Sequence, residues 1–194
     1  MKKLLVRLGL LALLLSQLSF AQQQPSPRTA TVVLVRHAEK ASNDPDAPLS
    51  AQGEQRAECL ARVLKDAGIK RIYVSDTRRT QQTADPLAKA LGIKPTVVPA
   101  NDTSTLVRDV FYGSGGNALV VGHSNTLPLL IQRVQAGTVP PIGENEYDGL
   151  YVLTVMEGSS TPVLKLRYCA ASAPSAAPAN MEPPKRKTPP AKKK

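Results

Sequence analysis

Each of the two histidines of the chain follows an apolar segment, with one residue in between. Arg36 separates His37 from the segment 31–35, and Gly122 separates His123 from the segment 118–121. A histidine among arginines is a reasonable nucleophile towards phosphorus, and the planar guanidinium group suits two-point contact with phosphate oxygens. The two histidines therefore suggest a phosphate site, provided that the ends of the two segments meet.

The apolar segments are typical of buried strands in a mostly parallel sheet. In open α/β sheets, ligands bind outside the carboxyl ends of the strands, so both imidazoles are expected at the same edge. A third predicted strand, 72–74, is followed by Ser75–Arg79, which adds two arginines. Composition and spacing alone leave an anion site and two unrelated histidines equally open.

Predicted helices alternate with predicted strands along the middle of the chain. Residues 49–67 are predicted to be a helix, with Ser50 as a candidate N-cap and Gly68 after the last turn. Pro86 is expected to kink or split the next helix. The remaining predicted helices are 77–91, 105–112 and 126–135, and the remaining strands are 96–98, 150–155 and 163–168. This alternation predicts a three-layer α/β/α sandwich around a mostly parallel central sheet.

The chain has 194 residues, a length that suits one domain. Its net charge of +10 lies mostly at the ends, because residues 22–169 hold 16 basic and 14 acidic side chains. A nearly neutral domain is a poor candidate for nucleic-acid binding. The composition also excludes collagen-like, coiled-coil and disulfide-framework classes.

Residues 1–21 resemble a signal peptide, in which lysines precede an apolar run too short to span a bilayer. We expect export to the periplasm or secretion, with residues 22–169 as the folded domain. The alternative is an uncleaved membrane anchor. An exported chain allows a disulfide between Cys59 and Cys169, and the fold decides whether the two cysteines meet.

Residues 170–194 are rich in Pro, Ala and Lys and lack apolar periodicity. Such a segment cannot bury enough apolar surface to form a core, so a disordered tail is expected. Its basic residues could contact an anionic envelope surface. A solvated tail without a function is an equally open interpretation.

Four segments resemble, in order, the motifs of the histidine phosphatase superfamily, which has the phosphoglycerate mutase-like fold. Val35–Glu39 is similar to the RHG motif, with Ala38 in place of the glycine, and Leu49–Ala57 is similar to the helix entry LTxxGxxQA. Ser75–Ala84 is similar to SxLxRxxQTA, and Val121–Ser124 is similar to the second-histidine motif. The likeness extends over residues 30–168.

The resemblance implies that His37 is the nucleophile and takes the phosphoryl group. Arg36 and Arg79 would clamp the phosphate oxygens, and His123 would hydrogen-bond the same group and stabilise its charge. Three substrate contacts are also implied or suggested, from Asn43, Glu39 and the helix start at Ser124. Asn43 has an alternative interpretation as a turn residue.

The general acid is the least defined role. Many relatives carry a Glu or Asp after the third strand, and this chain offers Asp102 there, with a helix N-cap as the alternative. Glu39 and Asp46 are reserve candidates, although Glu39 could instead orient His37 or pair with an arginine. Arg78 is interpreted as a surface residue of its helix.

The sequence thus predicts an exported phosphatase that hydrolyses a small-molecule phosphomonoester through a phosphohistidine. No metal or other cofactor is expected, since two histidines and no cysteine pair at ligand spacing do not make a zinc site. A mutase is less favoured because the loops are short and export separates the protein from glycolytic substrates. Acidic residues in the 138–148 loop disfavour highly anionic substrates such as inositol polyphosphates. The alternatives are a catalytically weak phosphate-binding envelope protein and an adhesin that acts through its tail.

Overall fold

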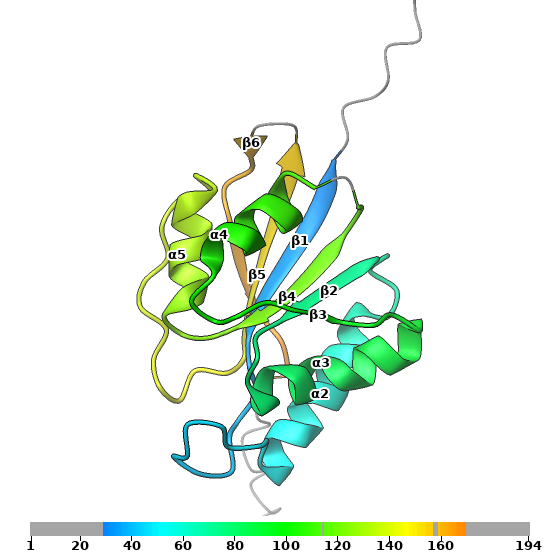
Figure 1. Cartoon of the computed structure of the whole chain (residues 1–194), viewed down its shortest axis with the longest axis vertical. Helices are drawn as coiled ribbons and strands as arrows, with labels where there is room; N and C mark the ends of the chain where they lie inside the picture. Colours follow the sequence, from blue (N-terminus) through cyan, green and yellow to red (C-terminus); the bar gives the residue numbers. More distant parts are fainter. Residues whose placement is uncertain (1–28, 114, 157–158, 170–194) are drawn as a thin grey trace, which may run out of the picture.

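The computed structural model describes residues 29–113, 115–156 and 159–169 (Figure 1). Its strands are β1 (Ala30–Arg36), β2 (Arg71–Val74), β3 (Thr96–Val97), β4 (Ala118–Gly122), β5 (Gly149–Met156), β6 (Ser159–Ser160) and β7 (Leu164–Arg167). Its helices are α2 (Ala51–Leu64), α3 (Arg78–Leu91), α4 (Thr103–Leu106) and α5 (Thr126–Arg133), with a π-helical turn, η1 (Val107–Phe111), directly after α4.

The strands form one sheet in the order β3-β2-β4-β1-β5-β6, and β7 also pairs with β5. The pairs β3–β2, β2–β4 and β4–β1 are all parallel. Strand β5 runs antiparallel to β1, β6 and β7. The carboxyl ends of β1, β2 and β4 therefore meet at one edge of the sheet, where ligands bind in open α/β folds.

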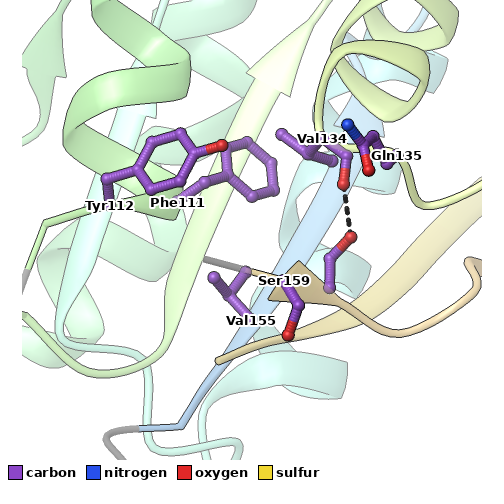
Figure 2. Close-up of a pocket in the computed structure, with 7 residues that line it drawn as sticks. Phe111, Tyr112, Val134, Gln135, Val155 and Ser159 are labelled. Carbon is purple, nitrogen blue, oxygen red and sulfur yellow. Dashed lines mark hydrogen bonds between the residues drawn. The ribbon is translucent and has the colours of Figure 1, made fainter. Parts of the chain in front are cut away.

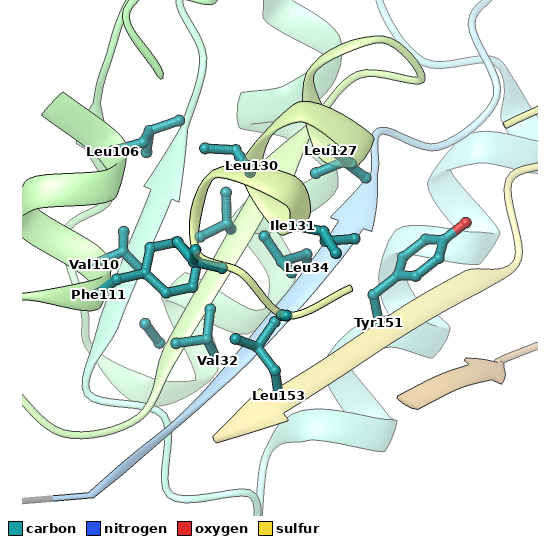
Figure 3. Close-up of a cluster of buried hydrophobic side chains, with 14 of the residues drawn as sticks. Val32, Leu34, Leu106, Val110, Phe111, Leu127, Leu130, Ile131, Tyr151 and Leu153 are labelled. Carbon is teal, nitrogen blue, oxygen red and sulfur yellow. The ribbon is translucent and has the colours of Figure 1, made fainter. Parts of the chain in front are cut away.

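Helices cover both faces of the sheet, which confirms the predicted three-layer sandwich (Figure 1). Val32 and Leu34 of β1 pack in a cluster with side chains from α4, η1 and α5 (Figure 3). Val33 and Val35 face the opposite way, into a cluster with α2 and α3. Because β1 is buried on both faces, its sequence is a continuous apolar run.

The start of α2 and the end of α3 follow the sequence signals, whereas α2 ends at Leu64, three residues before the predicted end at residue 67, and α3 differs in its interior. The Ser50 side chain accepts a hydrogen bond from the Gly53 N–H at the start of α2, and Gly92 ends α3 in the left-handed conformation. Pro86 lies inside α3, which is one uninterrupted helix, so the predicted possibility of a split is wrong. Leu87 and Ala88 beside the proline are buried in the core, and their burial offsets the cost of the lost hydrogen bond.

The predicted signal peptide and tail lie outside the described residues, and both stay predictions. Among the described residues, no helix has the length and apolar character that a membrane crossing requires.

A small pocket lies between η1, the end of α5 and the end of β5 (Figure 2). It is lined by Phe111, Tyr112, Val134, Gln135, Val155, Ser159 and Ser160. Val155 pairs with Ala30 at the start of β1, so this pocket lies at the sheet edge opposite the two histidines.

Cys59 of α2 and Cys169, after β7, form a disulfide with a Cα–Cα distance of 6.3 Å. One turn before Cys59, the Arg56 guanidinium group donates a hydrogen bond of 2.9 Å to the carbonyl of Cys169. The Nε atom of the same guanidinium group donates to both carboxylate oxygens of Glu39, each at 2.9 Å. The disulfide and Arg56 thus hold the end of β7 and the segment after His37 against the same helix.

Removal of this disulfide is expected to lower the free energy of unfolding by about 4 kcal/mol, because the bridge restricts the unfolded chain across a long loop. The two cysteines are 110 positions apart. Urea unfolding of the double variant Cys59→Ser, Cys169→Ser tests this expectation. A reducing agent should destabilise the parent protein and leave the double variant unchanged, and a difference below about 1 kcal/mol would contradict the prediction.

Candidate active site

The two histidines meet at the carboxyl edge of the parallel strands. The His37 N–H, directly after β1, donates a hydrogen bond of 2.9 Å to the carbonyl of Gly122 at the end of β4. The ring centroids of His37 and His123 are 5.3 Å apart, with the ring planes inclined by 64°. The sheet register therefore brings the two imidazoles together, as the strand ends predict.

The His37 ring is held in one tautomer. Its Nδ1 atom lies 2.8 Å from the carbonyl oxygen of Ala38, and because a carbonyl oxygen only accepts, Nδ1 must carry the proton. The Ala38 N–H in turn donates to the Thr83 hydroxyl at 2.9 Å. The lone pair of the neutral ring is consequently on Nε2, the atom available for attack on phosphorus.

The His123 ring has the opposite tautomer. Its Nδ1 atom lies 3.5 Å from a guanidinium nitrogen of Arg79, which can only donate. The proton is then on Nε2, which donates to the Ser75 hydroxyl at 2.9 Å. The Ser75 hydroxyl is also hydrogen-bonded to the Thr80 hydroxyl, at 2.9 Å. These two hydroxyl groups hold the orientation of the His123 ring.

Both imidazoles are neutral at physiological pH. Burial, aided by the nearby His123 and Arg36, lowers the pKa of His37 from 6.5 to about 3. Burial and the neighbouring Arg79 lower the pKa of His123 from 6.5 to about 4. A nucleophilic imidazole must be unprotonated, so His37 is in its reactive form throughout the neutral range.

Nitrogen NMR of the two ring systems should show neutral imidazoles with opposite tautomers between pH 5 and 8, since both pKa values lie below 5. His37 should carry its proton on Nδ1, and His123 should carry it on Nε2. The chain has only two histidines, so the variants His37→Ala and His123→Ala assign the signals. Titration of either ring near pH 6.5 would contradict the expectation.

Two guanidinium groups flank the rings, and each has a buried Nε with no hydrogen-bond partner among the described residues. Arg36 donates from one terminal nitrogen to the carbonyls of Gly143 and Glu144 at 2.6 and 2.8 Å. Arg79 donates to the carbonyl of Pro45 at 2.6 Å. A buried N–H without a partner costs about 1–3 kcal/mol, more when charged, and an anion would satisfy both groups.

An open cleft of about 410 Å³, here called the phosphoryl cleft, contains both rings and Arg79. It is lined by His37, Thr77, Arg79, Ala100, Asn101, His123, Ser124, Asn125 and Thr126. No Asp or Glu is among these described lining residues. Arg36 also lowers the pKa of both histidines, so two permanent positive charges act on one small site that suits a phosphoryl group.

The predicted residues Asn43 and Ser124 both lie beside Arg36 in a second cleft, which adjoins the phosphoryl cleft at Ser124. The turn at this place is formed by Ser42 and Asp44, whose side chains accept from the Asp44 and Asp46 N–H groups. Among the described residues, the Asn43 amide has no partner in these turn contacts. Its position leaves it available to a ligand.

The structure places Asp102 at the N-cap of α4, the alternative interpretation of this residue. Its carboxylate accepts from the Thr105 N–H at 3.0 Å, and this hydrogen bond lowers its pKa. Ala100 and Asn101 line the phosphoryl cleft, whereas Asp102 does not. A carboxylate held ionised by a helix end is poorly suited to protonate a leaving group.

The reserve carboxylates are also engaged elsewhere. Glu39 forms an ion pair with Arg56, with a shortest nitrogen–oxygen distance of 2.6 Å. Of the roles considered for Glu39, the structure therefore shows the pairing with an arginine. Asp46 accepts from the Arg78 N–H at the start of α3 at 2.8 Å. The Arg78 side chain is exposed, as expected for a surface residue.

Tyr147 is a prominent residue of the site that no sequence pattern predicted. Tyr147 packs its ring against the Arg36 guanidinium group, with the guanidinium carbon 4.3 Å from the ring centroid, and its centroid is 6.0 Å from that of His37. Such a cation–π contact helps to hold Arg36 in place. Tyr147 lies in a loop without periodicity, and its aromatic type was the only signal that could have indicated it.

The comparisons with known proteins agree with this arrangement. Residues 32–101 match the family model of the histidine phosphatase superfamily (branch 1). A probable phosphoglycerate mutase, GpmB, of Yersinia enterocolitica is 41% identical over 75 residues, which are 35% of this chain and 35% of that protein. The chain thus spans about a third of the length of this curated relative.

Two solved structures share the fold. The protein histidine phosphatase SixA, in complex with tungstate, has a TM-score of 0.60 at 21% identity and covers 71% of this chain and 96% of its own. A phosphoglycerate mutase from Bacillus anthracis has a TM-score of 0.59 at 16% identity and covers 70% of this chain and 92% of its own. The predicted phosphoglycerate mutase-like fold is confirmed.

Proposed function

This chain belongs to the histidine phosphatase superfamily, and on that premise we propose that it hydrolyses phosphomonoesters through a phosphohistidine on His37. The main support is the arrangement of His37 between two arginines. The neutral His37 ring offers its Nε2 lone pair beside two guanidinium groups whose buried Nε atoms have no partner among the described residues.

The reaction would proceed in two transfers at His37. In the first, Nε2 attacks phosphorus, the bond from phosphorus to the ester oxygen breaks, and the leaving oxygen takes a proton from water. In the second, water attacks the phosphohistidine, the nitrogen–phosphorus bond breaks, and phosphate and neutral His37 are restored. Arg36, Arg79 and the imidazole of His123 would stabilise the phosphoryl oxygens in both steps.

The lining of the phosphoryl cleft indicates which esters should react fastest. No carboxylate is among the described residues that line this cleft, and Glu144 lines the adjoining cleft instead. The departing oxygen would therefore leave without a general acid, whose contribution is typically about 10²–10⁴-fold. We expect kcat/KM for 4-nitrophenyl phosphate to exceed that for a simple alkyl phosphate by about 10²-fold or more. Phosphate release from a graded series of aryl and alkyl phosphates tests the proposal.

A control variant addresses the one acidic candidate from the sequence. Asp102→Asn keeps a good N-cap residue and removes the acid, so it should leave this leaving-group dependence unchanged. Equal rates on aryl and alkyl esters, lost in Asp102→Asn, would contradict the proposed chemistry and restore Asp102 as the acid.

Export to the periplasm or secretion is part of the proposal. It is supported by the sequence of residues 1–21 and by the disulfide between Cys59 and Cys169, since disulfides persist mainly in oxidising compartments. Fractionation of cells that produce the full chain tests it. Recovery of the reduced, uncleaved protein from the cytoplasm would contradict it.

One alternative has a specific observation in its favour. A phosphate-binding protein with weak catalysis would need the two arginines but no general acid, and no acidic side chain is among the described residues that line the phosphoryl cleft. Such a protein would bind inorganic phosphate and release none from any ester in the series. Measurable turnover that depends on His37 separates the two functions.

A further inference from the structure

The cleft that contains Asn43 is here called the leaving-group cleft. It has a volume of about 440 Å³ and is open to solvent beside the phosphoryl cleft. The two share Ser124, and Arg36, next to His37 in the chain, lines the leaving-group cleft. An ester whose phosphoryl group lies at His37 can therefore extend its remaining atoms into this space.

Lys40 is the feature that gives the leaving-group cleft its charge. It is partly buried, lines the cleft and forms no ion pair with any described residue. The isolated bridge between Lys40 and Leu49 fixes its backbone at the cleft wall. Arg36, also in the lining, is only 7% exposed, and its buried Nε, which has no partner among the described residues, is the group assigned to the phosphoryl oxygens. Lys40 is therefore the cation of this cleft that remains for a second anionic group.

The other side chains of the leaving-group cleft supply hydrogen bonds and a flat wall. The amides of Asn43 and Asn145 and the hydroxyl of Ser124 line it, and none of the three makes a side-chain hydrogen bond to a described residue. The Tyr147 ring, packed on Arg36, forms part of the wall. Glu144 is the one carboxylate among the described lining residues, and it would repel a group with several negative charges.

We propose that the leaving-group cleft binds a leaving group with a single negative charge, which Lys40 contacts and Asn43 and Asn145 hydrogen-bond. The inference rests on the proposed function, because it places the phosphoryl group at His37. It narrows the substrates to phosphate esters whose alcohol carries one further acidic group, such as a carboxylate. Cationic alcohols and polyphosphorylated ones fit the cleft poorly.

Three phosphonates of the same size test the charge preference without any turnover. 2-Carboxyethylphosphonate, 2-hydroxyethylphosphonate and 2-aminoethylphosphonate differ in the charge of one end and share a carbon–phosphorus bond that a phosphatase does not cleave. Titration calorimetry on the full chain gives their Kd values. We expect the carboxylate to bind about fivefold more tightly than the alcohol, and the amine to bind most weakly.

Three variants locate the preference. Lys40→Gln should remove the advantage of the carboxylate over the alcohol, and Glu144→Gln should increase it. Lys94→Gln makes the same change in net charge at an exposed site before β3, at the opposite end of the sheet, and should retain the parent preference. The preference is the ratio of the two Kd values measured on the same variant. A substitution that weakens the binding of both ligands equally therefore leaves this ratio unchanged.

The outcomes separate this inference from the proposed function. Equal Kd values for the carboxylate and the alcohol, absence of binding, or a preference that survives Lys40→Gln would overturn the charge-selective cleft, whether or not esters are hydrolysed. A preference that depends on Lys40 in a protein that releases no phosphate from any ester would support the cleft and reject the phosphatase.

Discussion

Replacement of His37 by alanine is expected to reduce phosphate release from 4-nitrophenyl phosphate by at least about 10⁴-fold, to the rate without enzyme. The proposed first step needs the Nε2 lone pair, which the Ala38 carbonyl leaves free by holding the proton on Nδ1. The nearby His123 cannot take over, because its Nδ1 faces Arg79 and its Nε2 donates to Ser75. Initial rates at neutral pH measure the effect.

The same variant should still bind inorganic phosphate, because both guanidinium groups remain. Phosphate binding by calorimetry and an unchanged far-ultraviolet circular dichroism spectrum are therefore its controls. A His37→Ala protein that is folded, binds phosphate and retains more than about a hundredth of the parent activity would exclude His37 as the nucleophile.

Arg79→Met is expected to lower kcat/KM by about 10²–10³-fold, the usual effect of removing one donor that stabilises transition-state charge. The methionine keeps much of the apolar stem and removes the guanidinium group. In the parent structure this group bonds to the Pro45 carbonyl at 2.6 Å and holds a buried Nε free for the substrate. Steady-state kinetics on an aryl phosphate gives the measurement.

Arg78→Met is the matched control for this effect. Arg78 is the neighbouring residue, carries the same charge and is exposed, so its replacement should change kcat/KM by less than about twofold. Similar losses in both variants would show that net charge, and not contact with the phosphoryl group, explains the effect of Arg79. Arg79 would then not be a clamp for the phosphoryl group.

The parts of the fold that sequence patterns predicted well are those with strong local signals. β1 is a continuous apolar run because both its faces are buried, and α2 begins directly after Ser50, whose side chain caps it. Pro86 shows where a local rule is insufficient. The rule describes an isolated helix, whereas α3 is also held by buried side chains on either side of the proline.

The same distinction explains which parts of the candidate site were predictable. Histidines after two buried strands had to meet once those strands were neighbours, as they are in β1 and β4. The place of Asp102 depends on the backbone path after β3, since one carboxylate can either cap a helix or face a ligand. The partner of Glu39, Arg56, is 17 residues away on α2 and is brought close by tertiary packing.

The covalent intermediate on His37 can be trapped and identified. The purified protein is mixed rapidly with an aryl phosphate, quenched in base, where phosphohistidine is stable, digested and analysed by mass spectrometry. We predict a phosphoryl group on the peptide that contains His37, formed at the rate of the first product burst and absent from His37→Ala. Turnover without this modification, or with phosphate on another side chain, would contradict the account.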